Sequence, residues 1–190
     1  RINIMLKRTL LLPLSLALIL ISPTITYAQQ PGFLRYDGYT VGVKIDYPND
    51  WVYNQYGGNI FSNEDVGVAF RPSSTINITK DYTNQSTPVT FQVAKQYDLP
   101  YKNMPLKMYL DYAKKLQSTI GNNVTAVENV TFNGIEGYKL NIKFNDGNVG
   151  FTILFNKNPE SYYFVYNAEP SLYDKYLPIV NQMINTFQFS

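Results

Sequence analysis

The chain has 190 residues, of which 45% are hydrophobic and 16% are charged, and its formal net charge is +2. This length suits one domain with its own core plus a short processed segment. The sequence contains no cysteine and no histidine. Their absence excludes disulfides, thiolate chemistry, Ser-His-Asp triads and the imidazole ligands of most catalytic zinc sites.

The first 28 residues have the order of a secretory signal peptide. Lys7 and Arg8 precede an apolar run over Leu10–Ile21, and the small residue Ala28 ends the segment. Cleavage after Ala28 places Gln29 at the mature N-terminus and predicts a secreted, extracytoplasmic protein. The alternative is an uncleaved leader that attaches the domain to a membrane, although the run is short for a bilayer span.

Removal of this leader changes the charge balance. Three of the 16 basic residues lie in it and all 14 acidic residues follow it, so the mature chain carries a net charge of about −1. The remaining basic residues are scattered, apart from Lys114-Lys115. No basic patch remains to attract nucleic acid, so no nucleic-acid partner is expected.

Hydrophobic periodicity predicts a chain of strands interrupted by one helix and closed by another. Residues 29–38 are polar and contain proline, so we expect a short linker there and one domain over residues 39–190. The expected strands are Gly38–Tyr47, Val66–Phe70, Thr90–Tyr97, Thr125–Phe132, Ile135–Phe144, Val149–Phe155 and Tyr162–Ala168, and the expected helices are Pro105–Ile120 and Ser171–Phe187.

Turn residues suggest how these strands connect. Pro48–Asp50 is expected as a turn that leads to Trp51, a packing anchor. The glycines before Ile60-Phe61 and the polar residues after it predict a hairpin with Val66–Phe70. Arg71–Pro88 is expected as an exposed loop. A two-residue Asn-Gly turn is expected at 133–134, inside a four-strand antiparallel meander.

The helices are expected to cover the sheet. Pro105 suits a helix start and Gly121 a helix stop. Ser171 and Asp174 have capping-box spacing, and Pro178 is expected either to separate the first turn or to kink the helix. Tyr162–Ala168 is apolar on both faces, which is typical of a central strand covered on two sides. The sequence therefore predicts an α+β fold with an antiparallel sheet between helices, in three layers.

Several core and turn segments resemble the PsbP-like family, whose namesake is an extrinsic protein of photosystem II. They are Tyr47-Pro48-Asn49-Asp50-Trp51, the strand Val66–Phe70, the meander through Tyr162–Tyr166 and the end Ile179–Phe189. The chain is most similar to the extracytoplasmic archaeal branch, over about Tyr39–Phe189. The resemblance implies a sheet between helices and a role as an extrinsic subunit. Metal binding in photosynthetic members involves histidine, so neither a metal site nor a photosystem role is carried over.

No motif in the sequence predicts catalysis, a cofactor or a metal. The acidic groups Asp46 with Asp50, Glu64 with Asp65, and Asp146 beside two asparagines lack calcium-loop spacing and suit turns. No nucleophile elbow, Ser-x-x-Lys or glycine-rich phosphate loop is present. Enzyme activity would need two carboxylates that converge in a cleft, within about 5 to 10 Å of each other.

Tyrosines and sequons supply the candidate sites. There are 17 tyrosines, and Tyr53, Tyr56 and Tyr101 are the candidates for an aromatic surface that binds a partner protein, although packing at the core edge explains most tyrosines equally well. Asn77 and Asn84 begin Asn-x-Ser/Thr sequons in the expected loop and are the candidate glycosylation sites.

These observations favour a non-enzymatic, exported accessory domain that docks on a membrane or envelope protein complex. The alternative is an extracytoplasmic small-ligand binder, for a sugar or an apolar molecule, with a pocket between the sheet and the loop Arg71–Pro88. A deep aromatic-lined cavity would favour the alternative.

Overall fold

The structure, a computed structural model, describes residues 31–57, 65–76, 87–96 and 103–190. The predicted signal peptide, residues 1–28, lies outside them. The described residues form two antiparallel sheets and two α-helices. In chain order the elements are β1 Phe33–Gly38, β2 Val43–Pro48, β3 Trp51–Tyr56, β4 Val66–Pro72, the short 3-10 helix Ser73–Thr75, β5 Val89–Lys95, α1 Leu106–Thr119, β6 Asn123–Phe132, β7 Ile135–Lys143, β8 Val149–Lys157, β9 Glu160–Ala168, α2 Pro170–Thr186 and β10 Gln188–Phe189.

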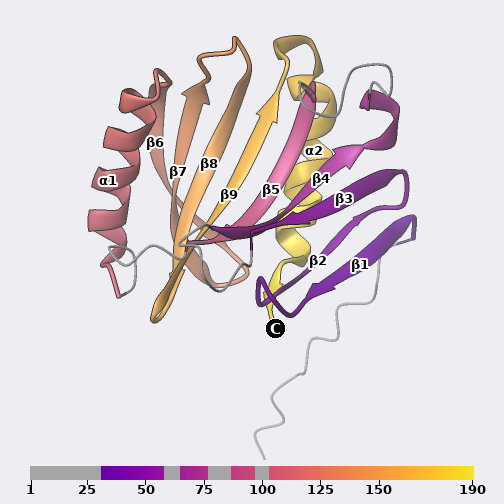
Figure 1. Cartoon of the computed structure of the whole chain (residues 1–190), viewed down its shortest axis with the longest axis horizontal. Helices are drawn as coiled ribbons and strands as arrows, with labels where there is room; N and C mark the ends of the chain where they lie inside the picture. The colour runs from indigo at the N-terminus through magenta and orange to yellow at the C-terminus, as the bar shows by residue number, and fades with distance from the viewer. Residues whose placement is uncertain (1–30, 58–64, 77–86, 97–102) are drawn as a thin grey trace, which may run out of the picture.

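The larger sheet has seven strands in the order β3-β4-β5-β9-β8-β7-β6 (Figure 1). Strands β6 to β9 form the predicted meander, and β9 lies at the centre of the sheet between β5 and β8. The predicted Asn-Gly turn joins β6 to β7, with φ of 49° at Asn133 and 76° at Gly134. Asparagine and glycine tolerate these positive φ values best, and this tolerance explains why the chain turns at these two residues.

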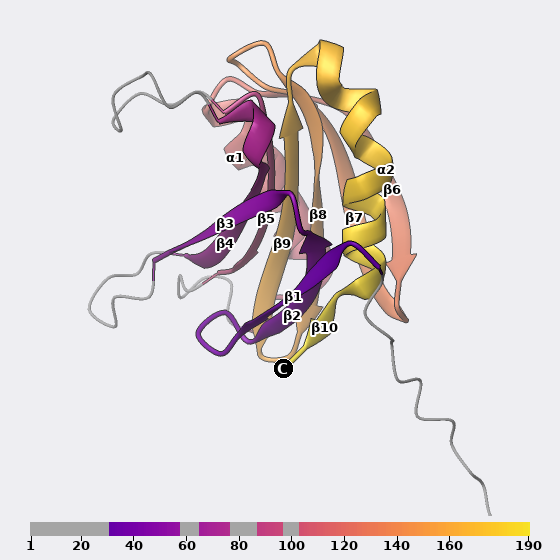
Figure 2. The same cartoon turned by 90° about the vertical axis from the view of Figure 1, so that its right-hand side faces the viewer.

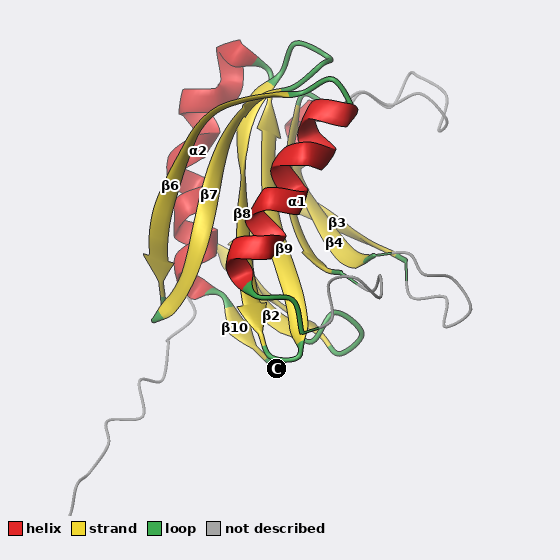
Figure 3. Cartoon of the chain, turned by 90° about the vertical axis from the view of Figure 1, so that its left-hand side faces the viewer, coloured by secondary structure: helices red, strands yellow, loops and turns green. Residues whose placement is uncertain are grey.

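The two helices cover opposite faces of this sheet, so the predicted three-layer α+β fold is confirmed. Figure 3 shows α1 in front of the sheet and α2 behind it. The main core lies on the α2 side, where Phe155, Phe164 and Phe187 are fully buried. A smaller core on the α1 side contains Leu110 and Leu154. Alternation along each strand supplies both cores, because successive side chains point to opposite faces.

The second sheet, β1-β2-β10, lies beside α2 (Figure 2). Its first strand corrects the predicted linker over 29–38, because β1 pairs with β2 along its whole length. Arg35 on β1 donates from Nε to Oδ1 of the buried Asp46 at 2.6 Å, and this ion pair joins the two strands. The predicted strand Gly38–Tyr47 is also interrupted: its first part is a turn, in which Gly42 has φ of 76°.

Strand β3 pairs with β4, and Trp51 lies opposite Pro72. The predicted hairpin partner Ile60-Phe61 lies outside the described residues. One further prediction needs correction. Helix α2 begins at Pro170 with Glu169 as its N-cap and no side-chain cap, so the predicted capping box is wrong. The fixed φ of proline suits the first helical position. Pro178 lies inside α2, which runs as one helix.

Candidate functional site

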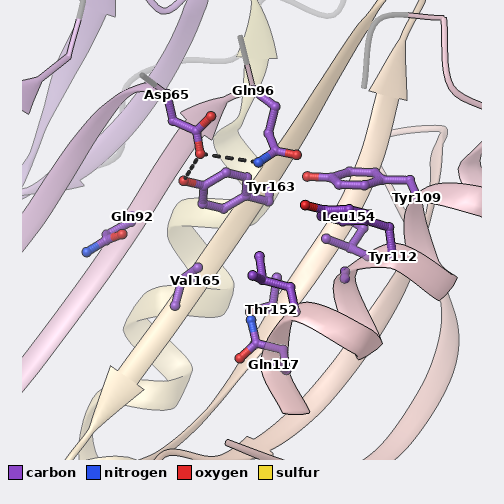
Figure 4. Close-up of a pocket in the computed structure, with 12 residues that line it drawn as sticks. Asp65, Gln92, Gln96, Tyr109, Tyr112, Gln117, Thr152, Leu154, Tyr163 and Val165 are labelled. Atoms are coloured by element: carbon purple, nitrogen blue, oxygen red, sulfur yellow. Dashed lines mark hydrogen bonds between the residues drawn. The ribbon is translucent and has the colours of Figure 1, made fainter. Parts of the chain in front are cut away.

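A cleft of about 220 Å³ lies between α1 and the adjoining face of the large sheet. Residues from α1 form one wall, and the rest is lined by residues from β5, β8 and β9, together with Asp65 just before β4 and Gln96 just after β5 (Figure 4). Sites for drug-sized ligands occupy about 300–1,000 Å³. This cleft therefore suits a ligand about as large as a single substituted ring.

Strand alternation places the lining residues. In β9, Tyr162 and Phe164 join the main core on the α2 side, whereas Tyr163 and Val165 line the cleft. In β8, Thr152 points to the cleft for the same reason. Helix α1 packs over β6 and β8 at one side of the sheet (Figure 1). The cleft lies along the edge of α1 that faces β9 and β5.

The lining combines aromatic rings with amide and hydroxyl groups. The rings come from Tyr109 and Tyr112 on α1 and from Tyr163 on β9. Gln92 and Gln117 contribute amides from opposite sides of the cleft (Figure 4). Each amide both donates and accepts hydrogen bonds, and each ring offers an apolar face with a polar tip.

Asp65 joins two of the lining side chains at one end of the cleft. The Tyr163 hydroxyl donates to Asp65 Oδ2 at 3.0 Å, and Gln96 Nε2 donates to the same oxygen at 3.2 Å (Figure 4). Bonds that donate to a carboxylate are stronger than bonds between neutral groups. They hold the Tyr163 ring and the Gln96 amide in fixed positions.

Burial dominates the ionisation of the tyrosines near this end. Burial raises the pKa of Tyr163 above its ordinary value, and the neighbouring Tyr56 and Asp65 add to the increase. Burial also raises the pKa of Tyr56 to about 12, partly offset by its hydrogen bond with Tyr163. Both hydroxyls therefore keep their protons at neutral pH and act as hydrogen-bonding groups, since desolvation disfavours the phenolate.

We expect the protein to lose stability at alkaline pH. An unfolded tyrosine releases its proton near pH 10, whereas folded Tyr163 and Tyr56 retain theirs. The native state then binds more protons than the unfolded state, so the free energy of unfolding falls as pH rises. For Tyr56, the contribution of its raised pKa to the free energy of unfolding is fully present below about pH 10. It is lost as the pH rises from there to about pH 12.

Urea unfolding at about pH 9 and about pH 11 measures this loss, since the ordinary tyrosine pKa lies between them. The Tyr163→Phe variant is the control, because phenylalanine has no proton to release, and its stability should fall less over the same interval. Equal midpoints at the two pH values in the unmodified protein would contradict the prediction.

Two buried polar atoms in the cleft have no hydrogen-bond partner among the described residues. They are Thr152 Oγ1 and Gln96 Oε1. Thr152 is only 5% exposed. A buried polar atom without a partner costs about 1–3 kcal/mol, and native proteins keep few of them. Both atoms belong to residues that line the same cleft.

The structure separates the tyrosines that the sequence grouped. Tyr53 and Tyr56 are three residues apart on β3, so they lie on opposite faces of the sheet. Tyr53 is 47% exposed and packs against Tyr36 at a ring-centroid distance of 5.2 Å. Tyr56 donates to Gln92 Oε1 at 3.4 Å on the cleft side. Tyr101 lies outside the described residues, and the role of all three as partner contacts stays a prediction.

None of the remaining predicted features is found among the described residues that line the cleft. Asn77 and Asn84 lie outside the described residues, as does most of the loop Arg71–Pro88, and residues 71–76 and 87–88 do not line the cleft. In the parts of the chain that the structure describes, no three acidic side chains come together as a metal site. Of the two described helices, neither has the length and apolar composition to cross a bilayer.

Sequence reasoning missed the polar strand residues of the cleft, although one signal for them was present. Thr152 and Gln92 are polar residues inside strands that are otherwise strongly apolar. In a strand covered on both faces, such a residue points into a packed layer and needs a partner there. The alternation of side chains along these strands could be seen in the sequence. The position of α1, the helix over residues 106–119 that covers this face, could not be predicted from it.

No protein-family model and no curated protein matches this sequence. The solution structure of cyanobacterial PsbP (CyanoP) from Synechocystis aligns with a TM-score of 0.56 and 15% identity, over 90% of this chain and 99% of that chain. A protein of unknown function from Pseudomonas aeruginosa aligns with a TM-score of 0.48 and 10% identity, over 81% and 94% of the two chains. LpqN from Mycobacterium tuberculosis, described as involved in cell envelope biogenesis, aligns with a TM-score of 0.42 and 9% identity, over 83% and 90%. The similarity to cyanobacterial PsbP shows that this chain has a PsbP-like fold.

Proposed function

We propose that this chain is an exported, non-enzymatic accessory domain that docks on a protein complex at the membrane or cell envelope. The order of charged, apolar and small residues over 1–28 supports export. The lack of histidine and cysteine supports a role without catalysis. The likeness to cyanobacterial PsbP, which extends over nearly all of both chains, supports an extrinsic-subunit type of domain.

One flank of α1 carries this proposal. Met108, Tyr112, Leu116 and Ile120 follow each other at intervals of four residues and are each 40–58% exposed. Side chains at this spacing lie on one side of a helix. The opposite flank is polar, with Lys107, Lys114 and Ser118 among its exposed residues. A contiguous apolar row beside a polar row is typical of a surface that contacts another protein.

Site-specific photo-cross-linking in native membranes tests this proposal. A photo-reactive phenylalanine analogue at Met108 should give a discrete adduct with a membrane-associated protein. The same analogue at Lys114, on the polar flank of the same helix, is the matched control and should give about tenfold less adduct, because interface energy concentrates in the buried apolar contacts. Only free monomer at both positions, or equal adducts from the two, would contradict docking through this flank.

A further inference from the structure

We infer that the cleft between α1 and the sheet binds the ring of a neutral sugar, either a free monosaccharide or the terminal residue of a glycan. The inference starts from the unpartnered atoms Thr152 Oγ1 and Gln96 Oε1. The carbonyl oxygen of Gln96 needs a donor, and the Thr152 hydroxyl can donate or accept. The hydroxyl groups of a sugar both donate and accept, so a single ligand type satisfies both atoms.

The same two atoms argue against an apolar ligand. An apolar molecule in the cleft would leave Thr152 Oγ1 and Gln96 Oε1 buried and unpaired, at a cost of about 1–3 kcal/mol for each atom. Of the two ligand types that the sequence left open, the sugar is therefore favoured.

The charge of the lining argues against an anion. Among the described residues that line the cleft, Asp65 is the one charged side chain, and no lysine or arginine is present. A carboxylate repels phosphates and carboxylates, whereas it accepts hydrogen bonds from hydroxyl groups. Two protein donors already bind Oδ2 of Asp65, which keeps it fixed as an acceptor at one end of the cleft.

The remaining lining residues match the two surfaces of a sugar ring. The ring of Tyr112, which is 41% exposed, offers an apolar face for the C–H side of the sugar. Gln92 Oε1 accepts from the Tyr56 hydroxyl and Gln117 Oε1 accepts from Asn122 Nδ2 at 2.6 Å, so each amide can offer its NH2 group as a donor to a sugar hydroxyl. The volume of about 220 Å³ accommodates one ring and leaves further sugars of a chain outside.

Titration of purified protein, expressed from the full chain, tests this inference. The free probes are glucose, galactose, mannose and N-acetylglucosamine, followed by saturation-transfer NMR and calorimetry, and a glycan array presents the same sugars as terminal residues. At least one probe should bind with a Kd of about 1 mM or tighter. Binding of free sugars identifies a monosaccharide ligand, whereas binding on the array alone identifies a glycan terminus.

The Thr152→Val variant separates a binding role from a structural one. The variant should weaken sugar binding at least tenfold, because it removes the hydroxyl that hydrogen-bonds to the sugar. It should leave the thermal midpoint equal or higher, because it also removes an unsatisfied buried atom. Thr125→Val, on β6 and outside the cleft, is the matched control and should bind sugar normally. Gln117→Met is a second cleft variant in case Thr152→Val fails to fold.

Two results would overturn the inference. The first is no binding by any free or terminal sugar, whether or not toluene binds. The second is unchanged sugar binding by Thr152→Val and Gln117→Met. Tyr112 and Leu116 belong to both the docking flank and the cleft lining, whereas Met108, the cross-linking position, does not line the cleft. An adduct at Met108 therefore reports docking alone, and the effect of Thr152→Val on sugar binding reports the cleft alone.

Discussion

Replacing Phe164 with alanine should lower the free energy of unfolding by about 3–5 kcal/mol, the range typical of a buried phenylalanine. Phe164 lies at the centre of β9 and is fully buried. Its ring centroid is 4.7 Å from that of Phe155 and 5.0 Å from that of Phe187. Because these partners come from β8 and the end of α2, the neighbouring backbone cannot collapse into the space that the ring leaves.

Urea unfolding followed by fluorescence measures this loss. Trp51 is the single tryptophan, it is 3% exposed, and unfolding will transfer it to water. Phe33→Ala is the matched control, since Phe33 is only partly buried, at the first position of β1, and it should lose much less. A loss below about 1.5 kcal/mol for Phe164→Ala would mean that the core repacks, since volume-conserving changes cost about that much.

The Gly150→Ala substitution should destabilise the fold by about 3 kcal/mol, because it forces two strands apart. Gly150 pairs with Asn167 where β8 meets β9. A Cβ atom at this position would overlap the backbone carbonyl oxygen of Tyr166. A backbone atom in a central strand cannot rotate away as a side chain can, so the strands themselves must shift.

Gly134→Ala provides the control for this effect. Gly134 has open space around its Cβ position but a φ of 76°. Alanine there costs about 1–2 kcal/mol through backbone strain alone. Chemical denaturation of the two variants compares the costs of overlap and strain. The prediction about Gly150 is wrong if Gly150→Ala is no less stable than Gly134→Ala.

Local patterns predicted most of the large sheet. The alternation over residues 125–168 and the Asn-Gly turn at 133–134 specify a meander whose neighbours are consecutive in sequence. Strand β1 was harder to identify because Arg35 and Asp37 interrupt its apolar pattern. The ion pair between Arg35 and Asp46 explains why a charged residue is tolerated in β1. This ion pair could be predicted only if the register between β1 and β2 were already known.

Local sequence patterns could not predict the candidate site. Its residues come from α1, β5, β8, β9 and the segment before β4, and strand order brings them together. Tyr53 and Tyr56 illustrate the error that follows when strand geometry is not applied. Their spacing of three residues suggested one aromatic surface, but on a strand it places them on opposite faces. Assigning residues 51–56 as a strand would have corrected this prediction.

The small sheet has a consequence for how the protein matures. Strand β2 has β1 on one side and β10 on the other, so Val43 lies opposite Phe189. Contacts between positions this distant in sequence form slowly, because a long loop must close first. During synthesis, β2 therefore keeps one unpaired edge until residue 189 has emerged.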